Sequence, residues 1–531
     1  MKKILYSLII TGIIGLIIYY FTLPALNLQS FGFWAFLIIL LCIFEFILAC
    51  FSIDERGRLR SSKKILSGVG ISVLVIVLGI ILLNVICSPL FQAKEYAKRI
   101  TIDETKEFTK SVKEVDFNSL PLLDKASSTK LGDRVMGQMP ELVSQFYVSD
   151  LYTQINYNDQ IVRITPLEYN GIFKYFSNRK NGVNGYITVN SVTGESELIK
   201  LDKGMKYMDS AFFSEDLMRH LRFSYPTKIF GEKSFEIDNE GNPYWIVPTM
   251  KYKGIGLKRE IASVIILDPI TGDSKEYKVE DVPTWVDHVY AADLIIEQVD
   301  DWGQYKNGFF NSIFGQKNVV QTTEGYNYMT MDDDVYLYTG ITSVSSDESN
   351  IGFILTNMRT KETNFYAVPG AKEYSAMESA KGQVQQMNYE ASFPLLINLN
   401  NRATYLLSLK DAAGLVKMYA FVDVADYQKV VITDSSKGIE KAAENYLENT
   451  SFEEQQEEAT SEKTISVAKI TQGNKEGNSY YYIEDSEHKK YRAALKINEQ
   501  ILPFLESGET VKIKYSQESE LTEILEIEYE Q

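Results

Sequence analysis

Cysteine is almost absent from this chain. The three cysteines, Cys42, Cys50 and Cys87, lie within or beside long apolar runs near the N-terminus. The residues after position 87 therefore cannot form disulfides, and ordinary hydrophobic cores must hold them together. This part is long enough for several such cores.

Histidine and catalytic motifs are equally scarce. The only histidines are His220, His288 and His488, and none stands at metal-ligand spacing from another histidine or a cysteine. The sequence contains no Gly-x-Ser-x-Gly elbow and no phosphate-binding loop. The acidic run 332–334 lacks the spacing of a calcium loop and predicts a solvated turn. We expect no catalytic residues, no metal site and no cofactor, hence a protein that is not an enzyme.

Charged residues are missing from the stretches 4–23, 31–51 and 65–87, except for Glu45 in the second. Each stretch is long enough to cross a membrane as a helix. Basic residues precede the first stretch and fill the loop 56–64, whereas the hinge 24–30 has none. Because basic short loops stay inside, we predict a multi-pass cell-membrane protein with a cytoplasmic N-terminus and an extracytoplasmic chain from about residue 89. A cleavable signal peptide is the competing interpretation of the first stretch, but no small-x-small site follows it.

Glu45 is the ionisable residue inside these stretches, and a carboxylate in lipid is costly. Thr11 and Ser72 lie at similar depth in the other two helices, and glycines nearby allow close helix packing. A proton or ion site is the functional interpretation of this intramembrane polar group. The alternative, which we favour, is a carboxyl that fixes the packing of a three-helix anchor.

The exported part is strongly acidic. Removing the seven basic and three acidic residues before position 65 from the totals of 54 and 71 leaves 47 and 68, a net charge of −21. Such a surface repels nucleic acid, so no nucleic-acid partner is expected.

A strand–turn–strand pattern recurs four times, at 185–200, 262–279, 351–368 and 417–432. Apolar residues flank Thr-Gly-type turns, as hairpins require. A further strand is predicted before each copy, at 171–176, 243–247, 335–338 and 403–409. Helices are predicted between the units at 214–221, 291–299, 374–386 and 439–447. This period predicts tandem α+β modules.

This order of elements resembles the PepSY domain, in which a helix precedes strands that end in an Asp-x-x-Thr-Gly-like turn. The turn Asp268–Gly272 matches it best, whereas Lys361 replaces the glycine in the third copy. The whole layout also resembles a membrane-anchored protein family of low-GC Gram-positive bacteria with a large extracytoplasmic region, for which no activity is established. The resemblance implies protein binding or inhibition rather than catalysis.

The C-terminal segment regains strand alternation after a polar, acidic stretch. Five strands with one helical turn between the third and fourth predict a small OB-like barrel. The predicted domains are a three-helix membrane anchor (1–88), a helical connector (89–143), α+β modules at 144–205, 206–285, 286–370 and 371–447, an acidic linker (448–463) and the barrel (464–531).

Aromatic side chains of the repeats could form an exposed stripe that binds a peptide or glycan, although core packing is the simpler interpretation. The candidates are Trp245, Tyr326, Tyr328, Tyr336 and Tyr338. Two functions follow from the sequence. The first is a non-catalytic interaction, regulatory or scaffold protein of the cell envelope that binds an exported or membrane protein, or itself. The second is an envelope enzyme or transport accessory subunit that uses Glu45.

Overall fold

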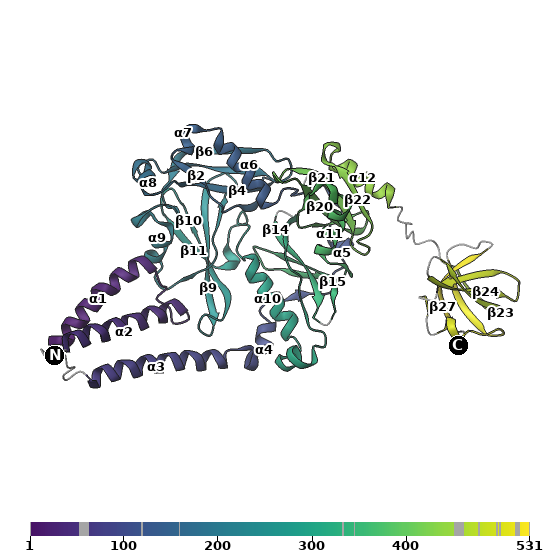
Figure 1. Ribbon diagram of the computed structural model, residues 1–531, viewed down its shortest axis with the longest axis horizontal. Helices are drawn as coiled ribbons and strands as arrows, with labels where there is room; N and C mark the ends of the chain where they lie inside the picture. The colour runs from purple at the N-terminus through teal and green to yellow at the C-terminus, as the bar shows by residue number, and fades with distance from the viewer. Residues whose placement is uncertain are drawn as a thin grey trace. The chain divides into compact units, whose positions relative to one another are not determined.

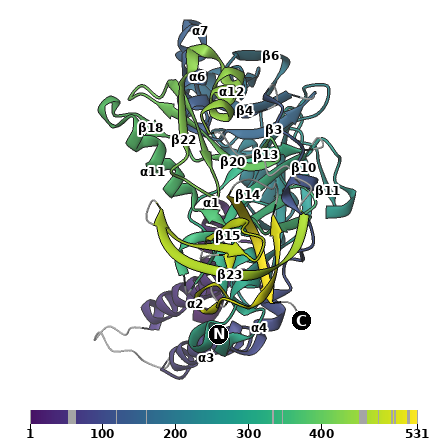
Figure 2. The same cartoon turned by 90° about the vertical axis from the view of Figure 1, so that its right-hand side faces the viewer.

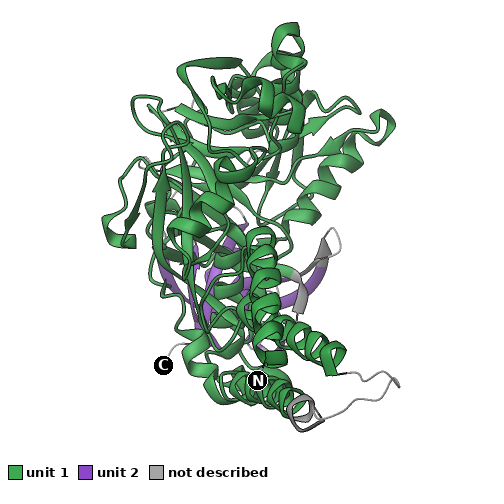
Figure 3. Cartoon of the chain, turned by 90° about the vertical axis from the view of Figure 1, so that its left-hand side faces the viewer, with its two compact units in different colours: residues 1–449 green, residues 450–531 purple. Residues whose placement is uncertain are grey.

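The structure is a computed structural model. It describes residues 2–52, 63–117, 120–158, 160–331, 334–344, 346–450, 461–475, 478–494, 497–498, 501–515 and 521–529. The chain forms two compact units, residues 1–449 and 450–531 (Figure 3). Most of the expected acidic linker, 451–460, lies outside the described residues.

Three apolar helices begin the first unit, and they confirm the expected membrane segments. They are α1 (Lys2–Thr22), α2 (Phe31–Ser52) and α3 (Lys63–Ile86), each long and apolar enough to cross a membrane. They extend from one side of the unit (Figure 1). On α1, the buried Ser7, Thr11 and Gly15 recur every four residues, and a Cβ on Gly15 would lie 3.0 Å from the Leu40 side chain of α2. Small residues thus let α1 and α2 approach closely.

Four antiparallel sheets follow one plan. In each sheet two short strands pair one after the other with the same edge of a long strand, the long strand pairs with a second long strand, and this second strand pairs with a further strand on its other side. That further strand is short in sheets 2 to 4 and ten residues long in sheet 1. Sheet 1 contains β2 (Phe146–Val148), β3 (Thr153–Tyr157), β4 (Gln160–Tyr169), β5 (Val183–Asn190) and β6 (Ser196–Met205). Sheet 2 contains β7 (Ile229–Phe230), β8 (Ser234–Ile237), β9 (Pro243–Lys253), β10 (Lys258–Leu267) and β11 (Ser274–Tyr277).

Sheets 3 and 4 repeat the plan. Sheet 3 contains β12 (Val320–Thr322), β13 (Asn327–Met331), β14 (Asp334–Ser343), β15 (Ser346–Asn357), β16 (Thr363–Tyr366) and β17 (Gly370–Ala371). Sheet 4 contains β18 (Glu390–Ala391), β19 (Leu395–Leu399), β20 (Arg402–Lys410), β21 (Val416–Asp423) and β22 (Val430–Asp434). The four recurring sequence segments are the antiparallel pairs β5–β6, β10–β11, β15–β16 and β21–β22. The prediction of a repeated hairpin is confirmed.

One predicted strand is wrong. Residues 171–176 were expected to precede the first hairpin as a strand, but they belong to helix α8 (Ile172–Asn178), and β4 fills that place. The chain leaves the sheet at Gly171, whose φ of 85° requires glycine. Tyr175 then turns inward, is fully buried, and packs its ring 5.4 Å from that of Tyr169. Burial of this tyrosine outweighs the strand propensity of the aromatic run.

The sheets stack, because the inner sheets bury both faces. Along β10, Val264 and Ile266 belong to one core, whereas Ile265 and Leu267 belong to another. Alternate residues of this strand therefore pack into two different cores, instead of facing one core and the solvent. The first core joins sheets 1 and 2, the second joins sheets 2 and 3, and the third joins sheets 3 and 4. We call this array the sheet stack.

Helices contribute to each of the three cores: α9 (Leu217–Ser224) to the first, α10 (Ala292–Tyr305) to the second and α11 (Glu373–Gln383) to the third. Helix α6 (Lys125–Gly137) covers the face of sheet 1 that points away from sheet 2, because its Gly132 approaches Ile187, whereas the adjacent Tyr186 packs on Phe235 of β8. Helix α12 (Ile439–Asn449) follows sheet 4 and packs on β21 and β22, at the far end of the unit from α1 to α3 (Figures 1 and 2).

The segment after α3 connects the anchor to several modules. Helix α4 (Pro89–Ala97) packs on α10, and β1 (Ile102–Asp103) then adds to sheet 3 beside β16, in parallel. Helix α5 (Phe108–Ser111) buries Phe108 in the third core. The chain reaches sheet 1 only afterwards, through α6 and the short helix α7 (Pro140–Val143). This segment is thus part of the sheet stack.

The second unit is a closed five-stranded barrel in the order β23-β24-β25-β27-β26. Its strands are β23 (Ser461–Lys475), β24 (Asn478–Asp485), β25 (Lys490–Ala494), β26 (Thr510–Tyr515) and β27 (Thr522–Tyr529), with a 3-10 turn (Leu502–Phe504) before β26. The long β23 pairs with both β24 and β26, and β25 pairs with β27 in parallel. The arrangement fits the expected OB-like barrel.

Candidate functional site

The ends of the membrane helices are hydrogen bonded to the tip of the β9–β10 hairpin. Asn84, near the end of α3, donates from Nδ2 to the Ile255 carbonyl (3.1 Å) and accepts from the Ile255 N–H (2.8 Å). In the hinge between α1 and α2, Gln29 accepts from the Gly256 N–H (3.0 Å) and the Tyr252 N–H (3.1 Å). Gly254 has a φ of 76°, and a Cβ there would lie 2.9 Å from the Asn84 side chain, so this contact needs glycine.

Helix α9 makes a second set of contacts with the same end of the anchor. Arg222 is 6 % exposed and donates from Nε to the Leu23 carbonyl (3.0 Å) at the end of α1. Arg219 places its guanidinium 4.5 Å from the centre of the Tyr20 ring. We call these two contact sets the membrane junction. Together they fix the sheet stack to the helices through main-chain groups as well as side chains.

The polar residues predicted inside the anchor do not converge. Thr11 is buried against α2, but its hydroxyl has no hydrogen-bond partner among the described residues. Ser72 is exposed on α3 and donates back to the Gly68 carbonyl (2.9 Å). Glu45 is half-buried and has no hydrogen bond or ion pair within the described part of the chain. Of the glycines expected at helix contacts, Gly15 lies at one.

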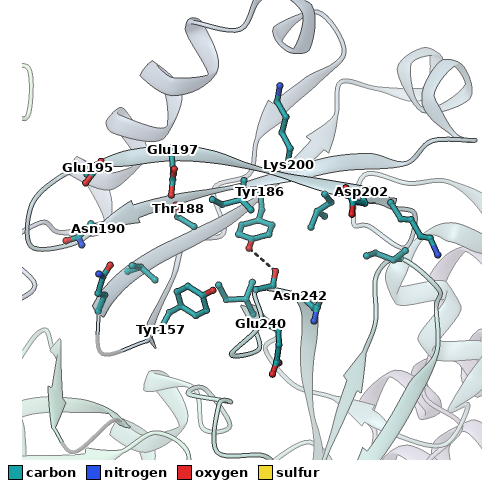
Figure 4. A pocket seen from close by; sticks show the side chains of 18 residues that line it. Tyr157, Tyr186, Thr188, Asn190, Glu195, Glu197, Lys200, Asp202, Glu240 and Asn242 are labelled. Carbon is teal, nitrogen blue, oxygen red and sulfur yellow. Dashed lines mark hydrogen bonds between the residues drawn. The ribbon is translucent and has the colours of Figure 1, made fainter.

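A groove of about 660 Å³ lies between sheet 1 and the turn that follows β8 (Figure 4). Tyr186 donates to the Gly241 carbonyl (2.9 Å) across it. Glu195 and Glu197 lie on its β6 side and Glu240 opposite, which makes the groove mainly acidic. Such a groove suits a cationic or polar surface segment of a partner better than an anion.

A second cavity, of about 600 Å³, opens where sheets 1, 2, 3 and 4 meet. Its lining includes Arg163 from β4, His288 from the loop before α10, Tyr326 and Tyr328 from the β13 region, and Phe393 from the segment before β19. We call it the Arg163 cavity. Because its walls come from segments up to 269 residues apart (124 and 393), it exists only in the assembled stack.

Arg163 in the wall of this cavity, and Gln154 beside it on the neighbouring strand, have side chains that lack partners among the described residues. Arg163 is 6 % exposed, and its side chain has no hydrogen bond or ion pair among the described residues; its Nε is fully enclosed. Gln154, directly opposite on β3, is 1 % exposed, and neither amide atom is hydrogen bonded within the described chain. The carboxylate of Asp124, another lining residue, is paired with Lys410. Burial lowers the pKa of Arg163 and raises that of Tyr328.

Asp287 and His288 have a structural role next to this cavity. The Asp287 carboxylate accepts from the Asn156 N–H (2.7 Å), and His288 Nε2 lies 2.5 Å from the Gln154 carbonyl oxygen. Both main-chain N–H groups of the pair donate to the buried Glu236 (2.8 and 3.2 Å). Because these groups are occupied by β3 and β8, they hold the wall in place and do not form an acid–base pair with a nucleophile.

The five predicted binding aromatics separate into two groups. Trp245 and Tyr338 are fully buried core residues, and Tyr336 packs against the third core. Tyr326 and Tyr328 line the Arg163 cavity with their rings 5.6 Å apart. Arg163 was not predicted as a site residue from the sequence. Its signal was an arginine between Val162 and Ile164 in an apolar strand, a position that is rarely charged without a reason.

No group of three or more potential metal ligands occurs among the described residues. Asp332 and Asp333 of the acidic run lie outside them, and Asp334 begins β14 and pairs with Arg359 (2.7 Å). No protein-family model matches this chain, and a search of curated proteins found no similar sequence.

One buried carboxylate makes stability depend on pH near neutrality. Glu168 is 2 % exposed, and burial raises its pKa from 4.5 to about 7, although Ser210 donates to it. The folded state therefore keeps a proton that the unfolded state releases, so stability falls as the pH rises from about 4.5 to above 7. The loss is about 3 kcal/mol at ~1.4 kcal/mol per pKa unit.

The Glu168→Gln variant has no such proton to lose. We expect its free energy of unfolding, relative to wild type, to rise by about 2.5 kcal/mol between pH 5 and pH 8. Thermal unfolding of both proteins at the two pH values measures this, and the exposed Glu197→Gln is the matched control. If the free energies of unfolding of variant and wild type differed by the same amount at both pH values, the raised pKa of Glu168 would be contradicted.

Proposed function

We propose that this protein is a non-catalytic interaction scaffold of a bacterial cell envelope. In this proposal the three helices span the cell membrane, the sheet stack and the barrel lie on the extracytoplasmic side, and the stack binds an exported or membrane protein or a second copy of the chain. The observation that carries the proposal is the membrane junction. A tethered enzyme domain needs only a flexible linker, whereas a scaffold must present its surface at a set position above the membrane.

The direction of insertion is supported by two independent features. Basic residues at 2–3 and 56–64 favour a cytoplasmic location of these segments by the positive-inside rule. The hinge 24–30 must then lie outside, and this hinge is hydrogen bonded to the sheet stack through Gln29 and through Leu26, whose N–H donates to the Pro226 carbonyl (2.8 Å). The basic residues favour an extracytoplasmic hinge, and the hydrogen bonds between hinge and sheet stack favour the same side of the membrane for the stack.

Exposed aromatic side chains beside α1 agree with this position. Phe223 is 56 % exposed, and its ring lies 5.9 Å from that of Tyr19 and 6.3 Å from that of Tyr20. Aromatic residues are enriched where helices leave the hydrocarbon core. In the proposed orientation Phe223 lies at this boundary. PepSY-like modules, which the sequence repeats resemble, also occur in proteins that bind other exported proteins.

Crosslinking of intact cells tests the function. The full-length protein carries a tag after Gln531, and an anchor-only chain of residues 1–97 with the same tag is the control. We expect a recurrent exported or membrane protein, or a crosslinked dimer of the chain itself, with the full-length protein alone. Recovery of the same proteins with both chains would overturn the scaffold proposal, as would protection of the tag inside the cytoplasm.

A further inference from the structure

Arg163 has no directly paired anion in its cavity: Asp124 is near enough to favour its charged form, but the Asp124 carboxylate is paired with Lys410. A buried guanidinium without an anion is unfavourable, because desolvation is not repaid by a partner. Arg163 is 6 % exposed and has no hydrogen bond or ion pair among the described residues. The neighbouring Gln154 adds an amide without partners on the same face of the sheet. Each unsatisfied buried group needs an explanation, and a ligand that pairs with the guanidinium would supply one here.

The charges around the cavity leave Arg163 available. Three lining residues are engaged elsewhere: Asp124 with Lys410, Asp293 with Arg259 and Lys233 with Asp209. Lys125 and Glu232 are exposed at the cavity and have no ion pair within the described chain. The interior therefore carries one unpaired positive charge, and its rim carries one charge of each sign.

The remaining walls suit an apolar group beside an anion. Tyr326, Tyr328 and Phe393 contribute aromatic rings, and Met358 and Leu151 contribute aliphatic surface. A volume of about 600 Å³ is in the usual range for a small-molecule or peptide site. Arginine binds a carboxylate through two parallel N–H bonds, and such charge-assisted pairs are strongest where water is excluded.

We propose that the Arg163 cavity binds the carboxylate of a peptide-like ligand, with the guanidinium of Arg163 paired to the carboxylate and the apolar side chain packed on the aromatic walls. The ligand enters the site as the free C-terminus of a partner protein or as a short free peptide. This binding goes beyond the scaffold role, which needs only an outer surface, so either proposal can fail without the other.

The binding test uses the full-length protein in lipid nanodiscs. The probes are an equimolar mixture of acetylated tripeptides that differ in the last residue, supplied as free acids and as C-terminal amides; mass spectrometry identifies the retained peptides. We expect retention of free acids at least about tenfold above their amides, because a hydrogen-bonded charge pair contributes about that factor or more. Equal retention of both forms, or retention of neither, overturns the proposal.

Variants assign the binding to the arginine. Arg163→Met is expected to lose the preference for free acids. Arg163→Lys is expected to keep part of it, because lysine retains the positive charge but cannot donate two parallel N–H bonds to a carboxylate. The exposed Arg179→Gln, whose partner is Glu215, is the matched control and should bind as wild type does. Tighter binding of inorganic phosphate than of the best free acid would overturn the carboxylate assignment. Retention of a twenty-residue peptide with the same last residue identifies a protein C-terminus as the source, and its loss identifies a short free peptide; both results support the site.

The melting temperature of the ligand-free protein provides a second test. Without ligand, Arg163→Met is expected to raise the melting temperature by a few degrees, because it removes an unpaired buried charge. A lower melting temperature would show that the guanidinium stabilises the fold itself and would overturn the proposal. This measurement does not depend on the choice of peptide.

Discussion

The Arg99→Ala variant is expected to lose about 1.5–3 kcal/mol of unfolding free energy, because it removes a charge-assisted hydrogen bond to the buried Asp301, which then keeps only Lys258 as its cation. The Arg99 side chain is 8 % exposed and pairs with Glu297 (3.0 Å) and with Asp301, whose side chain is 4 % exposed. It also donates to the Arg259 carbonyl. Arg99 thus ties the segment after α4 to α10 and β10, at the point where the anchor enters the stack.

Thermal or denaturant unfolding of the full-length protein in nanodiscs measures this loss. The matched control is Arg179→Ala, because Arg179 forms a single pair with Glu215 (3.3 Å) and its side chain is 47 % exposed. An exposed pair of this kind contributes about 0–1 kcal/mol. Similar stability of the two variants would contradict the view that the Arg99 pairs hold the stack together.

The Trp245→Ala variant is expected to lose about 3–5 kcal/mol through the cavity that it opens. Trp245 is fully buried in the first core, where β9 of sheet 2 faces sheet 1. Its ring lies 5.2 Å from that of Phe235, and its Nε1 donates to the Tyr207 carbonyl (3.0 Å). The indole therefore contributes packing between two sheets and one buried hydrogen bond.

Trp245→Phe separates these contributions. It keeps an aromatic ring but leaves the Tyr207 carbonyl without its donor, so we expect a smaller loss than for alanine, of about 1–3 kcal/mol. The order wild type, phenylalanine, alanine in unfolding free energy is the expected result. A loss below about 1 kcal/mol for alanine would mean that sheets 1 and 2 are not joined through this residue.

The sequence predicts features that depend on local pattern. Apolar runs of about 20 residues predict the anchor, and alternation around Thr-Gly turns predicts the four hairpins and the barrel strands. The same rules fail at 171–176, where tertiary burial of Tyr175 overrides strand propensity. They also say nothing about stacking, because Ile265 and Ile266 look alike in sequence although they enter different cores.

The candidate sites depend on contacts that the sequence does not encode locally. The aromatic residues Tyr326 and Tyr328 were predicted, but Arg163 lies on β4, some 160 residues earlier in a chain of 531. Asn84 similarly contacts Ile255 across 171 residues. In both cases the recognisable signal is one polar residue inside an apolar run. The role of that polar residue can be inferred only from the assembled stack, which shows whether its side chain has hydrogen-bond partners.

The most direct test of the central claim is the distance between spin labels on the anchor and on the sheet stack. With the native cysteines replaced by serine, labels at Leu28→Cys in the hinge and Glu197→Cys on β6 report their separation in lipid nanodiscs. A membrane junction that fixes the stack predicts one narrow distance distribution, which broadens when Asn84 and Arg222 are both changed to alanine. A broad distribution in the protein with an intact junction would contradict the account, since the stack would then be tethered rather than held.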